Sequence, residues 1–496
     1  MPRAGPKHHP AVVVTLDHPD EIFLPGSIVS GTVAVASGTR HVQICLFGRS
    51  KVLIIQSHGE GKDYWRGRTT LFKHVAFLDG PPVSRASDGK DVWRFNVQIP
   101  THTVPAPIVH GRNDPWKVHD KFLDNAEMDV SSHPLPGVFY FVGEARGQKG
   151  ECYIEYVLEA RVHPTRDDDI IGGLDGDGGK KRPKKKGKFG HPPTTVVPLV
   201  VRMRSTDTPI DYAALMAETN EGTRIRTLRL LPQYATEKIG LKQSIRSVLQ
   251  PSKVPTYSFD VRVAAPSTVQ LDNPSHIPFR LSVIPRAADG SIFDGSAGTT
   301  LPDVKITAFK LSLKMSVLMR ARGLRLLNWD VLCIKHQDFV LAPELPVHMV
   351  GYVIPREGDD VSLDETNGAA GENNLDLGRL FDLRISRTHS TWEPPNSLTP
   401  SATRTDFNPR RPLWPSFKSY NIHVWYQWKY KMTVLCAGET QTVEGKAPVT
   451  LIGQSESQEQ DITVDRQGVR KKWREMMQGA EGVGEVAAAV GGSLGD

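Results

Sequence analysis

Few residues in this sequence have the types and spacing that catalysis or metal binding requires. Cys333 and His336 place a thiol and an imidazole three residues apart. On a strand, residues three apart point to opposite faces, so we expect these side chains to pack separately rather than to act as a nucleophile and its base. Asp175 and Asp177 match part of a calcium loop, but the closing glutamate of an EF-hand is missing, so a solvated loop is expected.

The sequence also lacks two motifs that often mark an enzyme. It contains neither the H-E-x-x-H pattern of zinc proteases nor the G-x-x-x-x-G-K-[ST] pattern that cradles a nucleotide phosphate. Its 17 histidines are scattered singly along the chain. We therefore predict a protein that is not an enzyme, with no catalytic residue, no metal ligand and no cofactor.

The composition is that of an ordinary globular protein. The chain has 496 residues, a length that fits two or three domains, and 39% of them are hydrophobic. No apolar run reaches the roughly 18 residues of a membrane-spanning helix, and the first ten residues lack the apolar segment of a signal peptide. The 4 cysteines lie far apart, and no N-glycosylation sequon is present. We therefore expect a cytoplasmic protein whose cysteines are small buried residues in strands.

Most of the net charge of +6 lies in one short segment. Its basic residues are Lys180, Lys181, Arg182, Lys184, Lys185, Lys186 and Lys188. The rest of the chain is close to neutral, so no nucleic acid partner is expected. The segment has three functional interpretations: contact with an anionic membrane surface, a nuclear-import signal, or lysines that accept ubiquitin. The competing, non-functional interpretation is a solvated run of charges that the aspartates just upstream partly neutralise.

Apolar and polar residues alternate with a period of two along most of the chain. The clearest runs are 29–35, 93–99, 154–160, 309–317 and 422–434. Such strands have one dry and one wet face, which is typical of antiparallel sheets that bury their apolar faces against each other. The pattern predicts an all-β fold of two tandem immunoglobulin-like β-sandwiches, at 10–205 and 254–455.

A short, partly helical connector is predicted between the two sandwiches, at 206–253. Residues 210–218 favour a helix by propensity, and Leu241, Ile245 and Val248 follow helical spacing.

Three further segments have irregular composition. They are predicted to be a basic loop at 164–192, a disordered insertion at 355–412 and a disordered tail at 456–496. Within the tail, residues 469–477 could form a short amphipathic helix with basic neighbours, although a frayed tail is the simpler interpretation.

The order of several motifs resembles the arrestin N-domain. Residues 23–33 (Phe-Leu-Pro-Gly-Ser-Ile-Val-Ser-Gly-Thr-Val) are similar to the Pro-Gly turn and second strand of that domain. Residues 42–48, 70–72, 95–100 and 150–160 follow in family order. Residues 416–422, 435–438 and 448–452 are similar, more loosely, to the closing strands of an arrestin C-domain. Fungal α-arrestin-like proteins are the nearest in character.

This resemblance implies an adaptor that links membrane-protein cargo to ubiquitination, endocytic trafficking or signalling machinery. The partners would be cytoplasmic tails of membrane proteins, at the plasma membrane or endosome. α-Arrestins characteristically recruit HECT-type ubiquitin ligases through P-P-x-Y motifs, and this chain has none. The candidate substitute is the weaker variant formed by Leu231, Pro232, Gln233 and Tyr234. A strand that buries these residues is the competing interpretation.

Two other functions stay open. A retromer-type sorting subunit would have a similar double sandwich but would act inside a fixed complex. A carbohydrate-binding β-sandwich protein is the second alternative, which the missing signal peptide and sequons disfavour.

Overall fold

The computed structural model describes the chain from Ala11 to Ser457 in several stretches. The segments outside this description are residues 1–10, 39–40, 60, 104–132, 146–147, 164–192, 235–253, 288–291, 293–300, 322–324, 335–338, 348–374, 388, 392–404, 407–412 and 458–496. Strands predominate in the described stretches, and helical structure is confined to short turns. This confirms the predicted all-β fold.

The first sandwich consists of two antiparallel sheets. One has the order β1-β2-β6-β5, and the other has the order β4-β3-β8-β7 with β9 also paired to β8. The bounds are Val12–Leu16 (β1), Ile28–Val35 (β2), His41–His58 (β3), Gly61–Leu78 (β4), Ser84–Arg85 (β5), Asp91–Gln98 (β6), Phe139–Ala145 (β7), Gln148–His163 (β8) and Thr194–Leu199 (β9). Alternate residues of each sheet, such as Val33 of β2 and Leu46 of β3, are buried in the core.

The second sandwich also has two main sheets. Their orders are β10-β11-β13-β17 and β12-β23-β22-β14-β15, with β16 paired to β14 and β21 paired to β22. The bounds are Met216–Arg226 (β10), Thr256–Pro266 (β11), Thr268–Gln270 (β12), Arg280–Pro285 (β13), Val304–Ala321 (β14), Arg325–Ile334 (β15), Phe339–Val347 (β16), Leu375–Asp376 (β17), Phe417–Lys418 (β21), Ile422–Cys436 (β22) and Glu439–Ile452 (β23). A small sheet is formed by Arg384–Ile385 (β18), His389–Thr391 (β19) and Thr405–Asp406 (β20).

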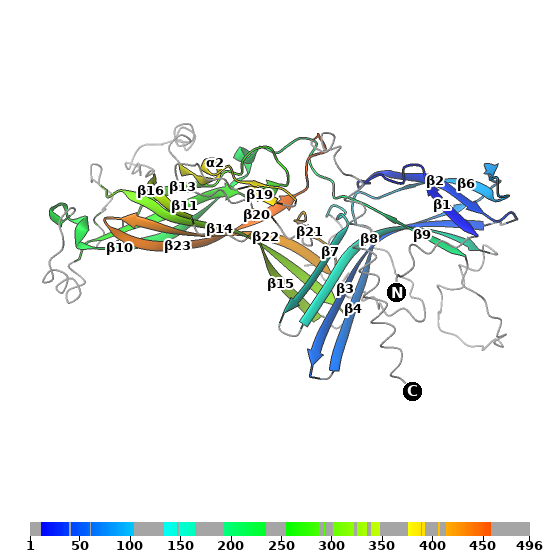
Figure 1. Cartoon of the computed structure of the whole chain (residues 1–496), viewed down its shortest axis with the longest axis horizontal. Helices are drawn as coiled ribbons and strands as arrows, with labels where there is room; N and C mark the ends of the chain where they lie inside the picture. Colours follow the sequence, from blue (N-terminus) through cyan, green and yellow to red (C-terminus); the bar gives the residue numbers. More distant parts are fainter. Residues whose placement is uncertain are drawn as a thin grey trace, which may run out of the picture.

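The two sandwiches meet near β7, β21 and β22 (Figure 1). The ring of Phe139 on β7 packs edge-on against Trp414 and Phe417, with centroids 5.6 and 4.9 Å apart. Beside these rings, the buried side-chain oxygen of Asn421 accepts hydrogen bonds from Ser50 and Thr69. The apolar cores of both sandwiches are therefore joined into one.

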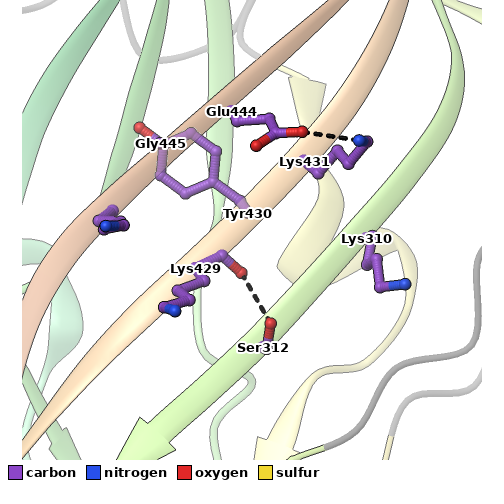
Figure 2. Close-up of a pocket in the computed structure, with 8 residues that line it drawn as sticks. Lys310, Ser312, Lys429, Tyr430, Lys431, Glu444 and Gly445 are labelled. Atoms are coloured by element: carbon purple, nitrogen blue, oxygen red, sulfur yellow. Dashed lines mark hydrogen bonds and ion pairs between the residues drawn. The ribbon is translucent and has the colours of Figure 1, made fainter.

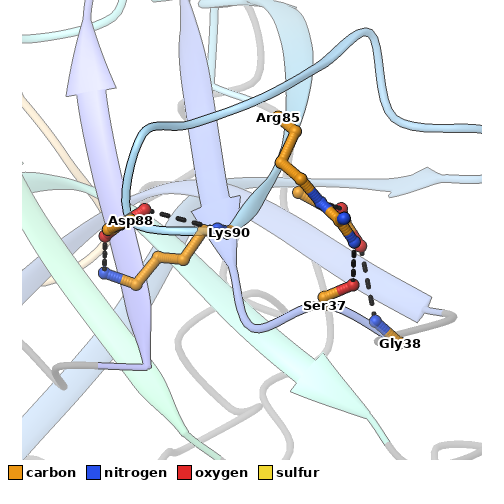
Figure 3. A network of polar contacts seen from close by, with 6 residues as sticks. Ser37, Gly38, Arg85, Asp88 and Lys90 are labelled. Atoms are coloured by element: carbon orange, nitrogen blue, oxygen red, sulfur yellow. Dashed lines mark hydrogen bonds and ion pairs between the residues drawn. The ribbon is translucent and has the colours of Figure 1, made fainter.

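An exposed network of polar contacts lies at one end of the first sheet (Figure 3). Asp91 accepts hydrogen bonds from Arg85 Nε at 3.2 Å and from the Gly38 amide at 3.3 Å. Arg85 also donates to Ser37 Oγ at 2.5 Å. Because these groups face water, each contact contributes little to stability, and their role is to tie the ends of β2, β5 and β6 together.

The predicted helix at 210–218 is wrong. Only Tyr212–Leu215 forms a turn of 3-10 helix, and Met216 begins β10. Eleven residues of β10 pair with β11, from Met216 opposite Pro266 to Arg226 opposite Thr256. Tertiary pairing here outweighs a local helix propensity worth a few tenths of a kcal/mol per residue. The expected helix near Leu241 lies outside the described residues.

The predicted disordered insertion is also wrong for part of its length. Within 355–412, the described segment 375–387 contributes β17 to a sheet and buries Leu377, Phe381 and Ile385. Asp376 caps the short helix α2 (Leu377–Leu380) by accepting a hydrogen bond from the Arg379 amide. These apolar residues are few among many polar ones, so the overall composition of 355–412 predicted disorder for the whole segment.

The cysteine prediction holds where the side chains are described. Cys45, Cys152 and Cys436 are free, buried and located in strands. Cys333 lies in β15, and His336 lies outside the described residues.

Candidate anion-binding site

Five lysines lie on one face of the larger sheet of the second sandwich. Lys310 and Lys314 belong to β14, Lys429 and Lys431 to β22, and Lys446 to β23. The residues next to these lysines are buried in the core, except the half-buried Gly445, so the lysines alternate outward. We call this group the lysine face.

Strand register brings these lysines together. Lys310 lies opposite Lys431, which lies opposite Glu444 on β23. In the neighbouring row, Ser312 of β14 lies opposite Lys429, which lies opposite Lys446. Residues directly opposite have β-carbons about 5 Å apart, so the ammonium groups reach the same small region.

A shallow depression of about 380 Å³ lies among these rows (Figure 2). Its lining residues are Lys310, Ser312, Lys429, Tyr430, Lys431, Glu444, Gly445 and Lys446. Four lysines and one glutamate give the lining a net positive charge. The Ser312 hydroxyl donates to the backbone oxygen of Lys429 at 3.4 Å, which ties β14 to β22 beneath the side chains.

Glu444 is held by one lysine. Lys431 Nζ lies 2.6 Å from Glu444 Oε1, and both side chains are more than half exposed. The hydrogen bond from Lys431 and its positive charge lower the pKa of Glu444. The carboxylate therefore stays ionised at neutral pH and neutralises one lysine of the row.

The floor of the depression depends on Gly445. The Tyr430 hydroxyl lies where a β-carbon of residue 445 would be, and it donates to Glu221 at 3.1 Å. The same hydroxyl lies 2.8 Å from the Thr219 hydroxyl on β10. Burial raises the pKa of Tyr430 to about 12, so the hydroxyl remains a proton donor at neutral pH. Because residue 445 has no side chain, the Tyr430 hydroxyl can reach Thr219 and Glu221 of β10, and this contact joins the two sheets of the second sandwich beneath the lysine face.

The arrangement can bind an anion. Several ammonium groups around an open depression attract phosphate or carboxylate groups, and the exposed setting suits a large or flat partner.

A second charged cluster is buried in the first sandwich. Glu155 of β8 pairs with Arg49 and with Lys51 Nζ, the latter at 2.9 Å. Burial by itself would raise the pKa of Glu155, but the charges and hydrogen bonds of Lys51 and Arg49 outweigh it and lower the pKa to about 2. The closeness of these contacts makes the cluster a structural element rather than an open binding site.

The Leu-Pro-x-Tyr motif lies at the surface rather than in a strand. Leu231 follows the 3-10 turn Leu228–Leu230, and Pro232–Tyr234 forms a second turn in which the Tyr234 amide donates to the Leu231 carbonyl. Pro232 and Gln233 are exposed, and Leu231 and Tyr234 are half-buried. The alternative of a buried strand is therefore wrong, although a 3-10 turn also differs from the polyproline conformation that WW domains bind.

The other predicted segments are not placed. The basic loop with Lys180–Lys188, the aspartates near 175 and the amphipathic segment at 469–477 lie outside the described residues. The lysine face itself was not predicted. The sequence feature that points to it is the placement of lysines at alternate positions of 309–317 and 422–434. In either strand alone, this pattern indicates only the solvent-facing side of the strand.

Three further observations concern possible ligands and relatives. Among the described residues, no three His, Cys, Asp or Glu side chains gather as metal ligands would. Within the same residues, no helix is long and apolar enough to cross a bilayer. No protein-family model and no curated protein matches the chain.

Proposed function

We propose that the protein is a non-catalytic, arrestin-like adaptor that works at the cytoplasmic surface of a membrane. The lysine face is the observation that carries this proposal. An anionic bilayer presents its phosphates and carboxylates in one plane, which matches ammonium groups on one face of one sheet. Each lysine near such a surface contributes about 1 kcal/mol, so several of them together attach a protein reversibly even though Glu444 neutralises Lys431.

The double sandwich supports the adaptor part of the proposal. Because the two cores are continuous, attachment through the second sandwich would hold the first in a defined orientation. Its surfaces could then engage cytoplasmic tails of cargo proteins, at the plasma membrane or endosome. Such an adaptor raises the effective concentration of one partner near another without making a covalent bond.

Vesicle co-sedimentation tests the membrane contact. The full chain is expected to bind phosphatidylcholine vesicles only when they contain phosphatidylserine, and less at high salt. The variant Lys429→Glu/Lys446→Glu should bind at least about tenfold more weakly, because two attractive charges become repulsive. The charge-matched control is Lys62→Glu/Arg94→Glu, at exposed positions of the first sandwich. Equal loss in both variants would indicate a general charge effect and would contradict the proposal.

Ligase recruitment is a separate part of the proposal. The exposed Pro232 and half-buried Tyr234 leave the motif accessible to a HECT-type ligase. Immunoprecipitation of the wild type and of Pro232→Ala/Tyr234→Ala, followed by mass spectrometry, tests it. Loss of a ligase only from the variant would support recruitment through this motif. Absence of a ligase from both samples would remove ubiquitin recruitment from the proposed function, and membrane attachment would stand independently.

A further inference from the structure

One backbone hydrogen bond folds the Leu-Pro-x-Tyr motif into its turn. The Tyr234 amide donates to the Leu231 carbonyl at 2.9 Å and closes the 3-10 turn Pro232–Tyr234. Leu231 itself is already extended, with φ −87° and ψ 133°. A polyproline helix has no internal hydrogen bonds, so this bond must break before the motif can take the conformation that WW domains bind. The motif thus lies at the surface in a closed conformation.

The segment that enters the motif is attached to the hairpin between β22 and β23. Arg229 Nη1 donates to the Gly438 carbonyl oxygen at 3.2 Å. A β-carbon at Gly438 would lie 2.1 Å from the same nitrogen, so the guanidinium lies directly against the hairpin backbone. The buried Thr227 hydroxyl donates to Glu439 Oε1 at 3.2 Å and accepts a hydrogen bond from the Arg229 amide at 3.4 Å. These contacts fix residues 227–229 to the hairpin.

This attachment leaves only one side of the motif open. Pro232 and Gln233 are exposed, whereas Leu231 and Tyr234 are half-buried. Just before them, Leu230 packs against the core. A WW domain that takes both the proline and the tyrosine into its groove has to contact the covered side as well. Binding therefore requires the turn to open and the segment to separate from the second sandwich.

We propose that the Leu-Pro-x-Tyr motif is autoinhibited by its own turn, which the contact of Arg229 with the hairpin holds in place. The inference rests on the ligase recruitment proposed above and concerns its regulation. A protein whose binding-competent conformation is a minor population binds its partner more weakly by the fraction that is open. A ligase would therefore bind the resting chain weakly, and a change that frees Arg229 or breaks the turn would strengthen the binding.

Isothermal titration calorimetry with a WW domain of a HECT-type ligase tests the proposal. The domain is titrated with the full-length protein and with a synthetic peptide of residues 228–238, and a Pro-Pro-x-Tyr peptide is the positive control. Because the peptide has no hairpin to hold it, it should bind at least about tenfold more tightly than the full chain. Equal affinities would overturn autoinhibition and leave ligase recruitment standing. If neither binds while the positive control does, ligase recruitment fails and autoinhibition falls with it.

The variant Gln233→Pro breaks the turn and keeps the proline and the tyrosine of the motif. Proline at this third position of the turn forces Pro232 out of the helical region and towards the polyproline conformation. The affinity of the full chain should rise at least about fivefold, because one hydrogen bond no longer opposes binding, whereas the affinity of the peptide should change less than about twofold. An equal rise in chain and peptide would show that no closed turn opposes binding and would overturn the proposal.

The variant Arg229→Ala tests the attachment to the hairpin. It should raise the affinity of the full chain at least about threefold. Arg226→Ala, at an exposed arginine of β10, is the matched control and should leave the affinity unchanged. Adding Pro232→Ala/Tyr234→Ala to Arg229→Ala should abolish the gain, and no gain in Arg229→Ala would overturn the role given to the hairpin contact. The comparison of the wild-type chain with the peptide needs no variant, so it decides the proposal even if a variant unfolds.

Discussion

Ser50 of β3 and Asn421, which directly precedes β22, share a buried hydrogen bond although 371 positions separate them in the chain. The Ser50 hydroxyl donates to the Asn421 side-chain oxygen, and the hydroxyls of Ser50 and Thr69 lie 2.6 Å apart. All three residues are almost fully buried. This cluster, together with the aromatic contacts beside it, attaches the second sandwich to the first.

Replacing Asn421 should therefore weaken the whole molecule. In Asn421→Ala the two hydroxyls lose their shared acceptor in a buried site, which costs about 1–3 kcal/mol. Urea denaturation followed by tryptophan fluorescence measures the change. The control is Asn96→Ala, on the exposed face of β6, which should cost less than about 0.5 kcal/mol. Equal stability of the two variants would show that the cluster contributes nothing.

Phe139 should be the main apolar contact of the same interface. Its ring is 1% exposed and packs against both Trp414 and Phe417. Phe139→Ala leaves a cavity there and should cost about 3–5 kcal/mol, whereas Phe139→Leu should cost less. Limited proteolysis is an independent measurement: faster cleavage of the alanine variant between the sandwiches is expected, and an unchanged rate would contradict the role given to this ring.

The buried Glu155 makes stability depend on acid pH. Its folded-state pKa of about 2 lies below the value of about 4.3 in an unfolded chain, so its ionised form stabilises the fold above the unfolded pKa. That contribution is lost as the pH falls from about 4 towards 2. Denaturation at several pH values should show this loss in the wild type.

The variant Glu155→Gln should lack this acid transition. It should also be destabilised by about 3–5 kcal/mol at neutral pH, because Lys51 is left buried without its carboxylate partner. Glu444→Gln, at an exposed ion pair, is the control and should change stability little. An unaltered acid transition in Glu155→Gln would assign the pH dependence to other groups.

Gly445 should tolerate no side chain. A β-carbon there would collide with the Tyr430 hydroxyl and the Glu221 carboxylate, so Gly445→Ala should cost about 1–3 kcal/mol and deform the depression. The matched control is Gly61→Ala, where the nearest atom, the His58 carbonyl oxygen, is 3.7 Å away. Thermal denaturation of both variants measures the difference. Similar melting temperatures would mean that Tyr430 moves aside at little cost.

The strands were predictable because their signal is local. The alternation at 309–317 and 422–434 recurs every two residues, and β14 and β22 follow it with one buried face and one face that is mostly half-buried. The helix predicted at 210–218 failed because propensity is a weak local preference, and pairing with the whole of β11 opposes it. Likewise, Leu377 and Phe381 pack into the core from within a polar segment whose composition favours disorder.

The amino-acid sequence by itself determined that the chain forms strands and that lysines alternate along the polar sides of two of them. Only the tertiary structure decided that β14, β22 and β23 are neighbours, in a register that places Lys310 opposite Lys431 and Lys429 opposite Lys446. The physical reason is the separation along the chain of the residues that interact. Side-chain alternation arises between adjacent residues, whereas strand order and register arise from packing and hydrogen bonding between segments that can be far apart, as β14 and β22 are in this chain.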